Sequence, residues 1–124
     1  MTLKVWQVFH LYCHFTLPEP KYKYVVIVSV KTHLVAFMIN SKINAIFPEA
    51  IACHASLPAT HHPFLKHDSY LDCTTPCFFP ENELTDFKGV IHESVRSQII
   101  KTIRICEELE QKYKKTIFAQ LMQH

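Results

Sequence analysis

Residues 24–30 (YVVIVSV) are the feature that most constrains the fold, because this stretch is β-branched almost throughout. A continuous run of such side chains is typical of a strand that is buried on both faces. Residues 31–33 then form a short polar break, and an apolar run resumes over residues 34–39. The two runs predict a β-hairpin at the centre of the fold.

Further short segments with strand character flank this hairpin. Residues 8–15 alternate apolar and polar side chains, and residues 68–73 and 77–79 read as two short extended segments separated by Pro76. Residues 49–57 form a weaker strand that Pro58 closes. Five or six short strands at close spacing, with no helical pattern between them, predict a small antiparallel barrel or a tight sandwich over residues 1–88.

The pattern changes its period after residue 88. Apolar side chains now recur at steps of three and four, which is the spacing of one helix face. Gly89 precedes this segment as its turn, and residues 89–120 are predicted to form a single C-terminal amphipathic helix. At 124 residues the chain fits one domain of mainly β structure with α. The predicted helix face consists of Val95, Ile99, Ile103, Cys106, Leu109, Tyr113 and Ile117.

Composition narrows the possible partners. Apolar residues make up 48% of the chain and charged residues 19%, which indicates a globular protein. Thirteen Lys and Arg against eleven Asp and Glu give a net charge of +2, and a charge this small does not by itself indicate nucleic-acid binding.

No apolar run approaches the roughly 18 residues of a membrane span. The first ten residues lack the pattern of a signal peptide, so no membrane contact and a cytoplasmic location are expected.

The five cysteines support the same location. Their number is odd, their spacing is irregular, and several lie inside apolar runs. They are therefore expected to be reduced thiols that act as small core residues.

A zinc site is the alternative to this interpretation. Cys73 and Cys77 are four residues apart, and four histidines are available as further ligands. Structural zinc sites usually have two tight ligand pairs, whereas the side chains of the adjacent His61 and His62 diverge in an extended chain. Two core cysteines on neighbouring strands are the favoured interpretation, so no metal and no cofactor are expected. No cysteine lies in a sequence context that lowers a thiol pKa, such as the start of a helix. A catalytic cysteine nucleophile is therefore not expected.

Residues 61–68 bring three imidazoles and an ammonium group into one loop next to a strand. RNA cleavage by its own 2′-hydroxyl needs a base, an acid and cations that stabilise the developing negative charge. This loop offers all three kinds of group without a metal ion. The alternative, a solvated polar loop, is favoured when the residues alone are considered.

Lysines alternate with tyrosines where the chain enters the central strand, in the order Lys21, Tyr22, Lys23, Tyr24. Such interleaving suits a phosphate contact combined with base stacking. An ordinary strand start with lysines facing water explains the same pattern equally well.

Three stretches together resemble the MazF/PemK superfamily of plasmid-maintenance toxins. Residues 23–29 (KYVVIVS) resemble the family's Arg-Pro-Ala-Val-Val-Leu-Ser strand, and residues 36–41 (AFMINS) resemble its apolar strand ending in Ile-Thr-Ser. Residues 68–73 (DSYLDC), followed by Leu84 and by Gly89-Val-Ile before the helix, resemble its Asp-Ser strand, its Arg-Leu and its Gly-x-Leu motif. The resemblance spans most of the chain from Lys23 onward and rests on the order of these motifs.

This resemblance implies an SH3-like barrel followed by a C-terminal helix. Members of the superfamily are typically metal-independent endoribonucleases that cut single-stranded RNA, form homodimers and are neutralised by an antitoxin. The family's arginine falls on Lys23 and its strand-end threonine on Asn40, with Ser41 matching the next serine. Lysine keeps the charge but lacks the bidentate grip of a guanidinium, and asparagine donates hydrogen bonds but transfers no protons.

The expected function is therefore that of a toxin-like endoribonuclease. Lys23 is expected to stabilise charge on the phosphate, Asn40 and Ser41 to position it, and His62 to transfer protons. Lys21, Lys66 and His67 are expected to bind RNA. The rival hypothesis is a non-catalytic barrel that binds RNA or a protein partner, and the substitutions at both catalytic positions of the family favour it.

Overall fold

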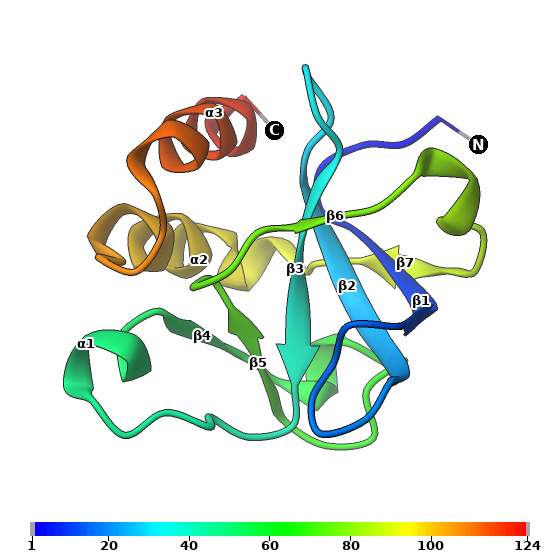
Figure 1. The fold of residues 1–124 in the computed structure, drawn as a ribbon, viewed down its shortest axis with the longest axis horizontal. Helices are drawn as coiled ribbons and strands as arrows, with labels where there is room; N and C mark the ends of the chain where they lie inside the picture. The colour runs from blue at the N-terminus through cyan, green and yellow to red at the C-terminus, as the bar shows by residue number, and fades with distance from the viewer. Residues whose placement is uncertain (1, 124) are drawn as a thin grey trace.

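The computed structural model describes residues 2–123, in which a seven-stranded antiparallel sheet curls into a half-barrel and carries helices on one side (Figure 1). The strand order is β4-β5-β3-β2-β1-β7, and β6 pairs with the far part of β3. The strands are β1 (Gln7–Cys13), β2 (Lys21–Ser29), β3 (Val35–Asn40), β4 (His54–Leu57), β5 (Ser69–Asp72), β6 (Cys77–Phe78) and β7 (Phe87–Val90). The helices are α1 (Pro48–Ile51), α2 (Glu93–Ile105) and α3 (Gln111–Met122), with short 3₁₀ turns at Ala59–His61 and Glu81–Glu83.

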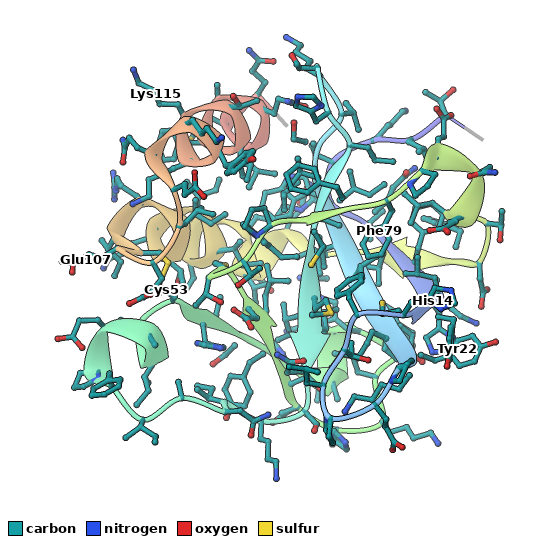
Figure 2. All side chains as sticks on the ribbon, in the orientation of Figure 1. His14, Tyr22, Cys53, Phe79, Glu107 and Lys115 are labelled. Carbon is teal, nitrogen blue, oxygen red and sulfur yellow. A yellow bond between two sulfur atoms is a disulfide. The ribbon has the colours of Figure 1, made fainter. Side chains whose placement is uncertain are left out.

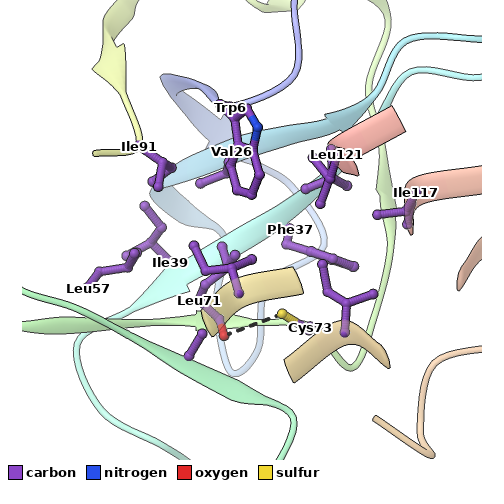
Figure 3. Packing of buried hydrophobic residues seen from close by; sticks show 14 of the residues in the cluster. Trp6, Val26, Phe37, Ile39, Leu57, Leu71, Cys73, Ile91, Ile117 and Leu121 are labelled. Atoms are coloured by element: carbon purple, nitrogen blue, oxygen red, sulfur yellow. Dashed lines mark hydrogen bonds between the residues drawn. The ribbon is translucent and has the colours of Figure 1, made fainter. Parts of the chain in front are cut away.

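The central hairpin is the expected one. Strands β2 and β3 pair in antiparallel register, and the β-branched part of β2 is fully buried. Its two faces contribute to different cores, because alternate side chains of a strand point to opposite faces. Val26 and Val28 lie in the main core beneath α2 and α3, while Val25 and Ile27 lie in a second core on the other face. Figure 3 shows the main core, in which Trp6 and Val26 lie among side chains from the sheet and from α3.

The prediction of a mainly β fold with helical structure at its C-terminal end is confirmed, and three details of it change. The weak strand expected over residues 49–57 is instead the short helix α1 followed by β4. Pro48 occupies the first turn of α1 and Glu49 lies in the same turn, which is where both residues favour a helix. Gly89 lies within strand β7, which pairs with β1, rather than in a turn.

The single helix expected over residues 89–120 is two helices, α2 and α3. Both bury the same kind of apolar face, with Ile99 and Ile103 from α2 and Ile117 from α3 in the main core, so the periodicity continues through the break. Three glutamates, at positions 107, 108 and 110, separate the helices. Carboxylates oppose the negative C-terminal end of one helix dipole and favour the positive N-terminal end of the next. Their position therefore accounts for one helix ending and another beginning there.

The cysteines also differ from expectation. Cys53, next to β4, and Cys106, at the end of α2, form a disulfide that ties the helix to the sheet (Figure 2). The other three cysteines are free and buried, as core residues should be. Burial raises the pKa of the Cys73 thiol, and it raises the pKa of Cys77 to about 11.

Among residues 2–123, no helix combines the length and the apolar character that crossing a membrane requires.

Candidate functional site

Lys23 and Asn40 meet where strands β2 and β3 reach the same edge of the sheet. Tyr24 pairs with Ile39, so Lys23 and Asn40 occupy the next position of the ladder. The ammonium group of Lys23 donates a hydrogen bond to Oδ1 of Asn40. The expectation placed both residues in one site, and the register of the central hairpin brings their side chains into contact.

This pair lies in a cavity of about 370 Å³ that we call the loop cavity. The loop between β1 and β2 forms one wall, and the hydroxyl of Thr16 holds this loop by donating to the carbonyls of Cys13 and Glu19. Three cations and four further polar side chains line the cavity, and no carboxylate is among its lining residues. The polar lining residues are Lys21, Lys23, Lys42, Thr16, Asn40, Ser41 and Asn44. Such a lining suits an anion, because ammonium groups and neutral donors face the same space.

The environment of Lys23 changes its protonation equilibrium. Burial lowers the pKa of its ammonium group, and the charge of Lys21 lowers it further. Cys13 and Asp72 act in the opposite direction with smaller effects. A lysine with a lowered pKa gives up its proton more readily than a solvated lysine, which suits proton transfer as well as charge stabilisation.

A second cavity of about 420 Å³, which we call the basic cavity, adjoins the first. Lys21, Lys23 and Ser41 line both cavities. Lys66 and His67 line the basic cavity from the loop before β5. The structure therefore brings six of the seven expected site residues to these two adjoining hollows.

His62 is the residue that the structure keeps apart from the others. Its side chain is fully buried, and it lines neither cavity. Nδ1 lies 2.8 Å from the carbonyl oxygen of Pro58, and Nε2 accepts a hydrogen bond from the backbone N–H of His92 at 3.1 Å. Burial lowers the pKa of His62, the hydrogen bond with the Pro58 carbonyl acts in the opposite direction with a smaller effect, and His92 and His61 lower the pKa further. A neutral ring whose two nitrogens both bond to the backbone holds the start of α2 and has no free atom for a substrate.

Sequence reasoning did not place His54 and Asp72 near this site. They face a third hollow of about 300 Å³ that also includes Asn40 and Asn44. Nε2 of His54 lies 3.7 Å from Oδ1 of Asp72, and its Nδ1 lies 2.8 Å from the carbonyl oxygen of Ala50. No sequence signal could have found this pair, because it depends on the pairing of β4 with β5 and of β5 with β3.

Within residues 2–123, no group of three or more His, Cys, Asp or Glu side chains is arranged to hold a metal ion. Cys73 lies in the main core, whereas Cys77 belongs to the second core, so these two thiols, the alternative zinc ligands, are directed into different parts of the interior.

Comparison with known proteins identifies the fold. No protein-family model matches the sequence. No curated protein matches it either. Among solved structures, the chain is similar to the Mycobacterium tuberculosis toxin MazF-mt6, with a TM-score of 0.59 and 17% identity over 82% of this chain and 97% of that one. It is also similar to an endoribonuclease in complex with its cognate antitoxin from a mycobacterial species, with a TM-score of 0.56 and 15% identity over 98% of this chain and 96% of that one. The protein therefore has a MazF-like fold.

Proposed function

We propose that this protein is a toxin-like endoribonuclease that cleaves single-stranded RNA at the loop cavity without a metal ion. The observation that carries the proposal is the contact between Lys23 and Asn40 in a cavity whose lining holds three lysines and no carboxylate. The MazF-like fold supports it, since both similar structures are toxins or endoribonucleases by name.

In this proposal Lys23 and Asn40 bind the scissile phosphate together. Oδ1 of Asn40 accepts from Lys23, which leaves the two N–H groups of its amide to donate to phosphate oxygens. Ser41 adds a hydroxyl from the next position. Negative charge grows on the phosphate oxygens in the transition state, so donors that are already positioned stabilise that state more than the ground state.

Proton transfer is assigned to His67 and Lys23. His67 lines the basic cavity, and its Nδ1 lies 3.2 Å from the carbonyl oxygen of Asp68, which leaves Nε2 as the free nitrogen. His67 accepts the proton of the 2′-hydroxyl as that oxygen bonds to phosphorus. The bond from phosphorus to the 5′-oxygen breaks, and Lys23, whose pKa burial lowers, donates a proton to the leaving oxygen. His62 positions α2 in this scheme.

An antitoxin is the proposed protein partner, because one similar structure is an endoribonuclease in complex with its cognate antitoxin. Leu17, in the loop before β2, lines the loop cavity and is strongly exposed. A partner that covered Leu17 would also close the cavity. Ile46 and Phe47, in the segment after β3, are two further strongly exposed apolar side chains. We also propose that the protein forms a homodimer and acts in the cytoplasm, a location that the Cys53–Cys106 disulfide does not support in the way that five reduced thiols would.

The rival function is an RNA-binding barrel without catalysis. One observation favours it: the cation beside Asn40 is an ammonium group, which binds phosphate as a point charge and not in the bidentate manner of a guanidinium. The same cavity and the same lysines would then serve binding alone.

Labelled single-stranded RNA incubated with the protein in EDTA separates the two functions. We expect the wild type to cleave, Lys23→Ala to lose both binding and cleavage, and His67→Ala to lose cleavage while still binding. His61→Ala is the matched control, because His61 belongs to the same polar segment but stacks on His92 outside both cavities. Binding without cleavage by the wild type would establish the rival, and neither binding nor cleavage at low salt would reject both functions.

A further inference from the structure

A row of aromatic rings runs across β1 and β2 from the basic cavity, and we call it the aromatic ladder. It consists of His14, Tyr12, Tyr22, His10, Tyr24 and Phe64. Successive ring centroids lie 4.8, 5.2, 5.3, 4.6 and 5.5 Å apart in that order. The strand register creates the row, since His10 pairs with Tyr24 and Tyr12 pairs with Tyr22, so their rings face one another across the strands.

The outer part of the ladder lies at the protein surface. Tyr22 is 64% exposed and Tyr12 is 40% exposed, and Figure 2 shows Tyr22 and His14 projecting from the same edge of the molecule. The Tyr22 ring contributes little to the core, because most of its area stays in water. Four or more rings in a continuous row differ from the scattered apolar side chains of an ordinary surface.

The other end of the ladder is in the basic cavity. His10, Tyr22, Tyr24 and Phe64 line this cavity together with Lys66. Lys21, at the start of β2, adds a second exposed cation to the same lining. The carboxylate of Asp86 lies beside the ladder, 3.8 Å from Nδ1 of His10 and 3.3 Å from Nζ of Lys88.

We propose that the aromatic ladder binds unpaired nucleobases of single-stranded RNA, next to the bond that the loop cavity cleaves. The placement of the RNA strand relative to the cleaved bond rests on the proposed function. Stacking of bases on the ladder is a separate binding event. Cations at one end meet the phosphates, and the π-faces of Tyr12 and Tyr22 stack on the bases. Exposed tyrosines beside lysines favour a nucleic acid over an apolar protein segment as the ligand. A nucleic acid offers phosphates to the lysines and bases to the tyrosine rings, whereas an apolar segment would leave the lysines without a partner.

The test measures binding apart from cleavage. The probe is a fluorescently labelled 2′-O-methyl oligonucleotide, which lacks the free 2′-hydroxyl and is not cut, and anisotropy gives its affinity. We expect Tyr22→Ala to weaken binding roughly 5- to 100-fold, which is the effect of losing one stacked base. Tyr22→Phe should bind like the wild type because the ring remains. Phe78→Ala is the matched control, since Phe78 is an exposed ring on β6, which pairs with β3 at Val35, far along the strand from Asn40.

A spectroscopic arm uses Tyr22→Trp. The native Trp6 is buried at 2% exposure and provides a constant background, so RNA added to Tyr22→Trp should quench the new emission by stacking. An unchanged emission together with unchanged affinity in Tyr22→Ala would overturn the ladder, whatever the cleavage assay shows. Loss of binding in Tyr22→Ala with no cleavage by the wild type would keep the ladder and reject the endoribonuclease. If the wild type did not bind the oligonucleotide at low salt, the proposal that the ladder binds nucleobases would be wrong. The cleavage assay alone would then decide the endoribonuclease function.

Discussion

The ammonium group of Lys23 donates a hydrogen bond to Oδ1 of Asn40 across strands β2 and β3. The bond orients the asparagine, because an amide whose oxygen is occupied presents its two N–H groups outward. It also holds a partly desolvated cation at the same edge of the sheet. The proposed chemistry treats these two side chains as one phosphate-binding unit.

A double-mutant cycle tests whether the two residues act as a unit. Lys23→Ala and Asn40→Ala should each lower kcat/KM for RNA cleavage by about 10²-fold, and the double variant should be little worse than the poorer single one. Effects that simply multiply would show that the residues act independently. Lys42→Ala serves as the control, because Lys42 lines the same cavity and contributes charge without belonging to the pair.

The pH dependence of cleavage tests the acid role of Lys23. A general acid must be protonated, so the rate should fall as pH rises through the pKa of Lys23, which lies below the ordinary lysine value. Asn40→Asp would place a carboxylate beside the ammonium group and raise its pKa, so the alkaline fall should move to higher pH. A pH–rate profile of both proteins gives the answer. An alkaline limb that is identical in the two proteins would contradict this role.

His62→Ala should destabilise the fold. The change leaves the carbonyl of Pro58 and the backbone N–H of His92 without their buried partner, and it opens a cavity at a fully buried position. We expect the free energy of unfolding in urea to fall by about 2–4 kcal/mol. His61→Ala, at an exposed neighbour, should change it by less than about 0.5 kcal/mol. Equal stability of the two variants would show that His62 does not hold α2.

Thiol titration tests the pairing of Cys53 with Cys106. Protein unfolded without reductant should show three free thiols, and reduced protein should show all five. The disulfide joins residues 53 positions apart, so the Cys53→Ser, Cys106→Ser double variant should lose about 4 kcal/mol of stability. Reductant should destabilise the wild type and leave this variant unchanged. Five free thiols in non-reduced protein would contradict the pairing.

Ile103→Asp tests the docking of α2 on the sheet. Ile103 is fully buried in the main core, and an unpaired carboxylate there should destabilise the protein by at least about 4 kcal/mol, leaving it unfolded or aggregated. Ile105→Asp is the matched control in the same helix, because Ile105 is exposed and should tolerate the change. NMR spectra of the two variants distinguish them. A dispersed spectrum from Ile103→Asp would contradict the docking.

The sequence by itself determined the local structure that depends on near neighbours. The β-branched run of β2 and the short break after it specify a buried hairpin, and the register of that hairpin places Lys23 beside Asn40. The three-and-four spacing of apolar side chains specifies helical structure at the C-terminal end. Both signals are strong because burial of one face repeats with the period of the element itself.

Only the tertiary structure decided what depends on contacts between distant segments. A histidine-rich loop has the same composition whether its rings face water or the core, and packing against the start of α2 buries His62 while His67 reaches the cavity. The pairing of Cys53 with Cys106 likewise requires α2 to lie against β4. The aromatic ladder needs the register of β1 with β2 and the approach of Phe64 to Tyr24. In each case the deciding interaction joins residues whose separation along the chain carries no periodic signal.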